Sequence, residues 1–381
     1  MSPAFQYPIP EYLKEYLEKY EKSTCYSLSN MQPEHIGLWP LKQSVLTSSI
    51  FDRLIQFLDN TIYSRSKQAE LHDILAYLLE IALPVFVLGM EKNPIHHNVQ
   101  TAENMLKIVT GQKKPYKFAR KAVVLALLHD IGNGLVDPGL KKIKISDIKD
   151  RRKQMEKEKR SKKEIKEEEK KLIAEADIYR RAHMNEGAKI AGRLIAELND
   201  RILKKKNRRI DNVGIREIEQ CIKIHDVPSI AEGYTKLGKT IPYSLLIPFK
   251  NGPGDDRTLP DFSDLANMLR EADRLWMVSR EGLEKDLFDD LKKEGTTYAF
   301  EKLKHNCRRF KEEYDLYKKA KSITPKHLAR FKGGTLFRNS AAFGLFRCYV
   351  SERIRELVVD NFGVDVMGMF IQATTIATEK K

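Results

Sequence analysis

The stretch LALLHDIGNGLVDPG, residues 125–139, decides how the rest of the sequence is interpreted. An apolar helical segment runs into a histidine and an aspartate side by side, His129 and Asp130, and a glycine-rich loop follows at once. The pair can either close the helix as ordinary polar residues or hold a metal ion. A metal site needs further protein ligands, so the remainder of the sequence must supply them.

Apolar residues recur at helical spacing through most of the 381-residue chain. Ile50, Leu54 and Leu58 repeat one helical turn apart, and the segments TAENMLKIV and KAVVLALL have wide apolar faces. The sequence contains no series of alternating strands and no repeat of the length typical of solenoids. The predicted fold class is therefore all-α.

The domain organisation follows from shifts in composition. We expect an N-terminal extension over residues 1–40, a main helical domain over 41–285 and a helical C-terminal region over 286–381. A charged insertion, residues 141–175, interrupts the main domain, and residues 141–171 contain 15 Lys or Arg against 8 Asp or Glu. Because few apolar residues occur there, we expect an extended solvated helix or a disordered arm. The alternative is an arm that binds phosphate or nucleic acid.

The charge and the cysteine content narrow the class of protein. A formal net charge of +15 favours anionic partners such as nucleotides, nucleic acid or a membrane face. The four cysteines are scattered without a CxxC pair, which argues against a disulfide framework and favours a cytoplasmic location. The N-terminus lacks the regions of a signal peptide, and the most hydrophobic run, residues 74–90, includes Glu80 and Pro84. We therefore expect a core helix there and no membrane span.

Six polar side chains lie at helix ends or on otherwise apolar helix faces, where an isolated charge would be costly. Each alone could be a satisfied core residue. Together, four imidazoles and two carboxylates that converge in a helical bundle can bind two divalent transition-metal ions. Nitrogen and carboxylate oxygen suit Fe, Mn, Zn or Ni, and no thiolate is needed. The six candidate ligands are His97, His129, Asp130, His183, His225 and Asp273.

This order of ligands resembles the HD-domain superfamily of metal-dependent phosphohydrolases, over roughly residues 90–280. The segments HNVQTA, LLHDIG and LREADRL are similar to the family's first-histidine helix, its signature turn and its last-aspartate helix. The resemblance implies an HD-domain-like helical bundle. It implies that His183 and His225 are the extra histidines of two-metal members and that Asp130 bridges both metals. The core ligands that it implies are His97, His129, Asp130 and Asp273.

The segment HDIGNGLVDPG, followed by HMNEGAKIAG, also resembles the HD-GYP branch, whose members hydrolyse cyclic dinucleotides. A Gly-Tyr pair, residues 233–234, follows His225 at about the spacing of that branch. The chain departs from the branch where Asn133 replaces a lysine, Asp226 replaces a histidine and Thr235 replaces a proline. The lysine and histidine serve phosphate and metal in that branch, so the resemblance implies a divergent relative. We take Asp130, Asp226 and Asn133 as catalytic candidates.

The reaction implied is hydrolysis of a phosphomonoester or phosphodiester, in a nucleotide or a related small molecule, by metal-activated water. The substrate phosphate would need cations, and arginine suits bidentate phosphate capture. Cations lie beside the ligands in sequence: Arg180 and Arg181 precede His183, Lys223 precedes His225, and Arg270 and Arg274 flank Asp273. Of these we favour Arg181, Lys223, Arg270 and Arg274 as substrate-binding residues.

Two other functions remain open. One is a di-iron oxygenase similar to myo-inositol oxygenase, which uses the same order of ligands and would be identified by iron specificity and oxygen consumption. The other is a non-enzymatic nucleic-acid- or partner-binding protein on an HD scaffold. Its mark would be salt-dependent nucleic-acid binding that survives loss of the metal.

Two further histidines, His72 and His96, occur in sequence contexts similar to those of the candidate ligands. His72 and Asp73 also form a His-Asp pair, but no glycine turn follows and the pair precedes the first-histidine helix, so we interpret it as structural or exposed. His96 adjoins His97. A Thr-Ala pair follows His97 at the spacing that the family's helix has, so we prefer His97 as the ligand.

Overall fold

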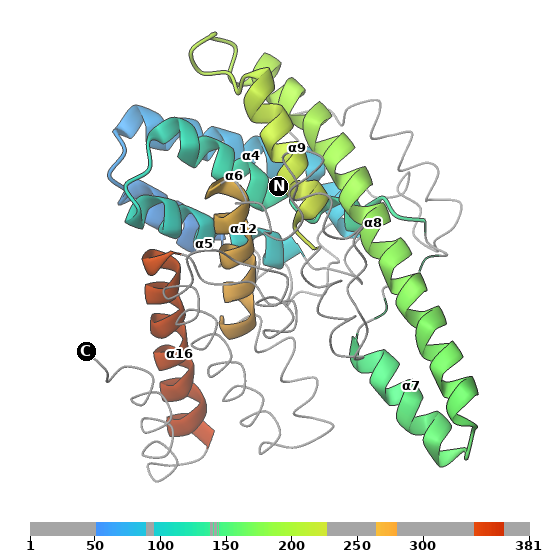
Figure 1. The fold of residues 1–381 in the computed structure, drawn as a ribbon. Coiled ribbons are helices and arrows are strands. Elements are labelled where there is room, and N and C mark those ends of the chain that lie inside the picture. Colours follow the sequence, from blue (N-terminus) through green and yellow to red (C-terminus); the bar gives the residue numbers. More distant parts are fainter. Residues whose placement is uncertain are drawn as a thin grey trace, which may run out of the picture.

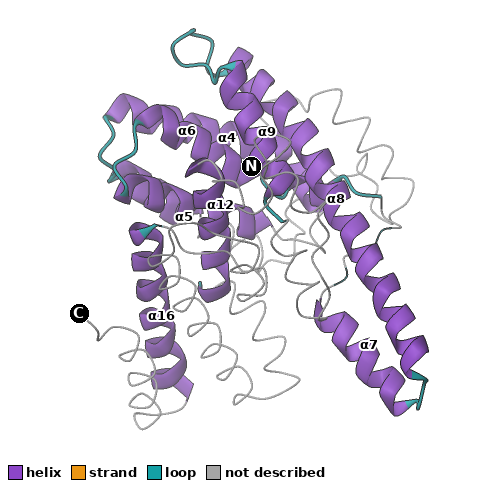
Figure 2. Cartoon of the chain, in the orientation of Figure 1, coloured by secondary structure: helices purple, strands orange, loops and turns teal. Residues whose placement is uncertain are grey.

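The computed structural model describes residues 51–88, 95–137, 140, 143, 145–226, 264–279 and 339–361 (Figure 1). Within these ranges every regular element is a helix, which confirms the all-α prediction for this part of the chain (Figure 2). The predicted N-terminal extension, residues 233–235 and residues 286–338 of the C-terminal region lie outside the described residues.

The centre of the fold is a helical hairpin formed by α5 (Ile95–Gly111) and α6 (Tyr116–Leu128). Every side chain from Ala122 to Leu128 on α6 is fully buried, because this part of the helix is apolar on all sides and neighbours surround it. Helix α4 (Arg65–Leu88) packs on α6, and α12 (Asp264–Leu275) packs on both α5 and α6. The stretch that ends in His129 is thus the innermost helix of the bundle.

A second layer contains α8 (Lys162–Arg201), which packs along α9 (Asn212–Ile224). The first half of α8 forms a hairpin with α7 (Ile145–Lys157) that projects from the body (Figure 1). Ser161 and Glu164 begin α8 with reciprocal capping hydrogen bonds. The described residues of the charged insertion are thus helical as expected, but they form two helices packed as a hairpin instead of one extended helix, and the second of these, α8, carries His183.

The glycines after Asp130 bring the 3₁₀ turn η2 (Ile131–Gly134) against two helices. A Cβ atom on Gly132 would lie 1.8 Å from the carbonyl oxygen of His183 on α8. A Cβ atom on Gly134 would lie 2.0 Å from the carbonyl oxygen of Val85 on α4. Only glycine permits such close approach of two backbones, so Gly132 sets the distance between the turn and α8, and Gly134 sets the distance between the turn and α4.

Helix α16 (Ser340–Asn361) packs against α5 and α12. Asn104, fully buried on α5, donates its amide to the carbonyl of Ala272 on α12 at 3.0 Å and accepts from the Tyr349 hydroxyl on α16 at 2.7 Å. Because Ala272 precedes Asp273, this hydrogen bond sets how α12 presents its aspartate to α5. The short 3₁₀ helix η4 (Trp276–Val278) continues α12.

The hydrophobic run predicted to form a core helix lies mainly in α4, where Ile74, Leu75 and Leu78 are fully buried. Among the described helices, none combines the length and the apolar composition that crossing a membrane requires.

Candidate metal centre

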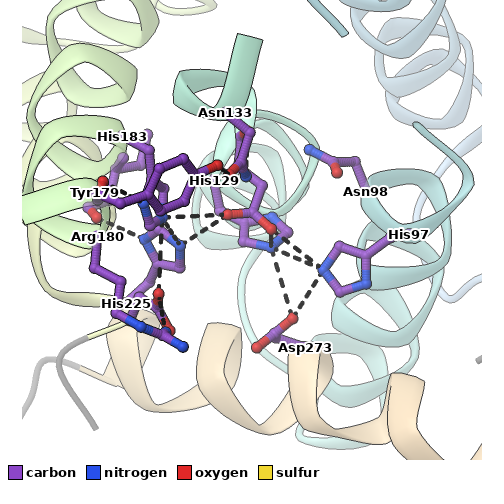
Figure 3. Close-up of polar contacts among 12 residues, drawn as sticks. His97, Asn98, His129, Asn133, Tyr179, Arg180, His183, His225 and Asp273 are labelled. Atoms are coloured by element: carbon purple, nitrogen blue, oxygen red, sulfur yellow. Dashed lines mark hydrogen bonds and ion pairs between the residues drawn. The ribbon is translucent and has the colours of Figure 1, made fainter. Parts of the chain in front are cut away.

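The six predicted ligands lie together in two groups of three. His97, His129 and Asp273 form one group, and Asp130, His183 and His225 form the other; in each, the ligand atoms lie within 4.8 Å of one another. In Figure 3 the labelled members of the two groups, His97, His129, Asp273, His183 and His225, point toward one another from the surrounding helices. Each group could hold a metal ion.

The first group joins α5, α6 and α12. His97 Nε2 lies 3.3 Å from His129 Nε2 and 3.0 Å from Asp273 Oδ1. His129 Nε2 lies 3.7 Å from the same aspartate oxygen. Asn98 donates its amide to the carbonyl of Leu127 at 2.9 Å, which sets how α5 and α6 align the two histidines.

The second group joins the end of α6 to α8 and α9. His183 Nε2 lies 3.4 Å from His225 Nε2. Asp130 Oδ1 lies 3.0 Å from His225 Nε2 and 3.6 Å from His183 Nε2. The close contact of Gly132 with α8 explains how the Asp130 carboxylate comes within reach of His183.

Asp130 faces both groups, one carboxylate oxygen to each. Its Oδ1 atom lies near His183 and His225, whereas Oδ2 lies 3.5 Å from His97 Nε2 and 3.4 Å from His129 Nε2. A carboxylate whose two oxygens point to two separate groups of nitrogens has the arrangement of a bridging ligand.

Local backbone contacts orient three of the four imidazoles. His129 and His225 are the residues that end α6 and α9, and their Nδ1 atoms lie 2.8 and 2.7 Å from the carbonyls of Ala126 and Ile222, three residues earlier. His183 Nδ1 lies 3.4 Å from the carbonyl of Tyr179. Since a carbonyl only accepts hydrogen bonds, Nδ1 is the donor in these three contacts, and Nε2 is the nitrogen that faces the centre.

This arrangement of donors and acceptors fits a cation. Without a proton or a metal ion among them, the Nε2 lone pairs of His183 and His225 at 3.4 Å and the Asp130 oxygen beside them would repel one another. A nitrogen and oxygen donor set of this kind is typical of sites for Fe, Mn, Zn or Ni. The side chains of the four histidines are 0–7% exposed, so water does not screen this repulsion.

The pKa values of His225, Asp130 and Asp273 also show that the site favours positive charge beside its carboxylates. Burial alone would lower the pKa of His225, but its hydrogen bond to Asp130 and the charges of Asp130 and Asp226 raise that pKa to about 9. Burial alone would raise the pKa of Asp130, but His129, His225 and His183 hold it well below its usual value. Partial burial alone would also raise the pKa of Asp273, but its hydrogen bonds to His129 and His97 hold that pKa far below its usual value. Both carboxyl groups are therefore ionised at neutral pH.

The other two catalytic candidates lie beside the second group. Asn133 is buried on η2, where it donates to the backbone carbonyl of Asp130 at 3.1 Å and accepts from the Tyr179 hydroxyl. Both the nitrogen and the oxygen of its side-chain amide are thus hydrogen-bonded to neighbouring protein groups. Asp226 Oδ2 lies 3.9 Å from His183 Nε2 and accepts a hydrogen bond from Arg180.

The four candidate substrate-binding cations lie in different environments. Arg181 pairs with Asp177 one turn earlier on α8, at 3.0 Å, and its side chain is 42% exposed. Lys223 is exposed on α9. On the helix that carries Asp273, Arg270 is buried and Arg274 is half-buried.

His72 and His96, the two histidines in similar sequence contexts, lie outside the ligand groups. His72 and Asp73 are exposed on α4. His96 is buried, and its ring packs against Trp276 with centroids 5.2 Å apart. The same indole contacts His97 edge-on at 5.0 Å, so Trp276 covers the first group on the His97 side.

Two neighbours of the centre were not among the favoured sequence candidates. Tyr179 is buried, and its ring lies 5.6 Å from that of His183. Burial, with the charges of Asp130 and Asp226, raises the pKa of its hydroxyl, so the group remains a hydrogen-bond donor. Arg180 pairs with Asp226. Both residues precede His183 by one helical turn, and that spacing is the sequence signal that could have identified them.

Comparisons with protein-family models, with curated proteins and with solved structures find no match to this chain, so its centre is interpreted from its own geometry.

Proposed function

We propose that this chain is a metal-dependent phosphohydrolase of the HD-domain kind, which holds two divalent transition-metal ions and cleaves a phosphate ester of a nucleotide or a similar small molecule. One observation carries the proposal: each oxygen of Asp130 faces a separate group that also contains two imidazole nitrogens. The order of the six ligands along the chain, which resembles the HD-domain superfamily, supports it.

The residues of the chain would divide the work as follows. Asp130 would belong to both ion sites, with His97, His129 and Asp273 completing one and His183 and His225 completing the other. When bound, the two ions would activate a water for attack on phosphorus and offset the negative charge on the phosphoryl oxygens. The backbone carbonyls of Ala126 and Ile222 would keep two imidazoles in the tautomer that ligation needs.

The substrate would enter beside Asp273 and Asp226. The Asp273 side chain is 39% exposed and that of Asp226 is 18% exposed, whereas the histidines are almost fully buried. The ester could therefore reach the two ligand groups from this edge, while the apolar bundle excludes water on the opposite side.

Elemental analysis of the purified chain, beside Asp130→Ala, tests the proposal. We expect about two first-row ions per chain in the wild type and almost none in the variant, because the shared carboxylate serves both sites. The metal-loaded wild type should hydrolyse p-nitrophenyl phosphate or its diester, and Asp130→Ala should not. The matched control is Asp73→Ala, which alters an exposed aspartate that also follows a histidine and should keep metal and activity.

Two outcomes would replace the proposal. Iron as the sole metal, with substrate-dependent oxygen uptake and no ester hydrolysis, would identify the oxygenase alternative. A wild-type chain that takes up no Fe, Mn, Zn or Ni would leave a binding protein without metal chemistry.

A further inference from the structure

An ion pair stands at the edge of the second ligand group. Arg180 lies three residues before His183 on α8, and Asp226 directly follows His225 at the end of α9. The Arg180 guanidinium donates from Nη1 to Asp226 Oδ2. Each helix that presents a histidine to this group thus also presents one member of the pair.

Both side chains of the pair can be reached from solvent. Arg180 is 17% exposed and Asp226 is 18% exposed, against 3% for the His183 side chain. Asp226 Oδ2 is 3.9 Å from His183 Nε2, so only the Asp226 carboxylate separates the Arg180 guanidinium from this ligand atom. Figure 3 shows Arg180 on the His183 and His225 side of the centre, away from His97.

The centre is therefore asymmetric. At the His97 end a buried indole, Trp276, packs on the imidazole, and this ring has no charge to offer a substrate. At the other end a guanidinium stands beside the ligand atoms. A phosphate ester bound across the centre would therefore find an additional cationic contact at the second end, from the Arg180 guanidinium.

Arg180 has donors to spare for such a contact. A guanidinium carries five N–H groups in a planar fork, and within the described part of the chain the hydrogen bond of Arg180 uses Nη1 alone. A phosphate can accept two parallel hydrogen bonds from this fork. Asp226 meanwhile fixes the rotamer of the long arginine side chain, which lowers the entropy lost when an anion binds.

We propose that Arg180 binds the phosphate of the substrate beside the Asp130–His183–His225 group, and that Asp226 positions its guanidinium. This inference rests on the proposed function and assigns the phosphate-binding arginine of that same centre. It differs from the sequence-based candidate Arg181, whose side chain pairs with Asp177 instead.

The test measures binding of inorganic phosphate to the metal-loaded chain by isothermal titration calorimetry, with metal content measured on the same samples. Arg180→Gln should keep both ions and bind phosphate about ten to one hundred times more weakly, since hydrogen bonds between charged groups are lost. Arg180→Lys should fall between, because it keeps the charge without the fork. Arg201→Gln is the matched control, since Arg201 also lies on α8 and pairs with Glu197.

A double variant, Arg180→Gln with Asp226→Asn, removes both charges and avoids an unpaired carboxylate near the ligands. It should also keep the ions and lose phosphate affinity. If Arg180→Gln keeps its metal and binds phosphate as tightly as the wild type, the inference is wrong and the phosphohydrolase proposal still stands. The same holds if Arg181→Gln, and not Arg180→Gln, weakens phosphate binding. Loss of metal in the double variant would make the pair a structural part of the ion site. A wild type without metal would end both proposals.

Discussion

The backbone of Gly132 lies directly against the carbonyl of His183, 51 positions further along the chain: a Cβ atom added at Gly132 would be 1.8 Å from that oxygen and 2.8 Å from the amide nitrogen of Gly187. The turn that follows Asp130 can reach α8 only because it has no side chain there. The distance between the two halves of the second ligand group thus depends on a glycine that is not itself a ligand.

Gly132→Ala should therefore separate Asp130 from His183. We expect a loss of about 3 kcal/mol in the free energy of unfolding, because the new methyl group meets rigid backbone atoms. Metal content should fall with it. Urea unfolding and elemental analysis measure the two effects.

Gly344→Ala provides the comparison. This exposed glycine in α16 has no atom within 4 Å of an added Cβ, and alanine should stabilise the helix by roughly 0.5–1 kcal/mol. If Gly132→Ala were as stable as Gly344→Ala and kept its metal, the close contact would have no role in forming the centre.

The two ligand groups should lose metal independently. Asp273→Ala removes a ligand from the first group only, and His225→Ala removes one from the second only. Each variant should retain about one ion per chain, because the other group keeps its ligands together with the Asp130 carboxylate that serves both sites. Elemental analysis after dialysis measures the stoichiometry, and complete metal loss in both variants would mean that the groups fill only together.

Tyr179 should act on the centre through Asn133. Its hydroxyl donates to the Asn133 amide oxygen, and the amide nitrogen of Asn133 donates to the Asp130 carbonyl. Tyr179→Phe should weaken binding of the second ion about tenfold, as removal of outer hydrogen bonds does at other metal sites. Titration against a metal indicator measures the affinity.

The control for Tyr179→Phe is Tyr63→Phe. Tyr63 is also buried, and its hydroxyl donates to the Lys114 carbonyl at 3.0 Å, outside the ligand groups. That variant should cost about 1 kcal/mol of stability and leave metal affinity unchanged. Equal affinities in the two variants would exclude a positioning role for Tyr179.

Deletion of residues 145–171 should leave metal content intact. The deletion removes α7 and the first turns of α8, whereas His183 and its neighbours lie further along α8, where the helix packs on α9 and η2. The cross-hairpin ion pairs, such as Arg151 with Glu168 at 3.6 Å, are lost together with both partners, and the partly exposed Glu175 loses only its exposed partner Lys171. A deleted chain without metal would show that the hairpin is needed to build the centre.

The sequence alone determined the helical class and the six residues that converge. Periodicity of apolar residues is a local property, and a histidine at the end of an apolar helix is recognisable without knowing what the helix packs against. His129 and His225, which end α6 and α9, could be found in this way, as could Asp273 on the apolar face of α12.

Only the tertiary structure decided how the six divide and which neighbours assist them. Which oxygen of Asp130 faces which group depends on packing among α5, α6, α8, α9 and α12. Arg180 and Arg181 are adjacent in sequence, but successive residues on a helix point roughly 100° apart, so one meets Asp226, just after α9, and the other Asp177 of its own helix. Composition marked the charged insertion as separate, yet α8 runs unbroken from it to His183, because helix continuity is set by backbone hydrogen bonds and not by polarity. Contacts between segments that are distant in sequence leave no local sequence pattern, and these contacts assemble the polar residues into two adjoining ligand groups.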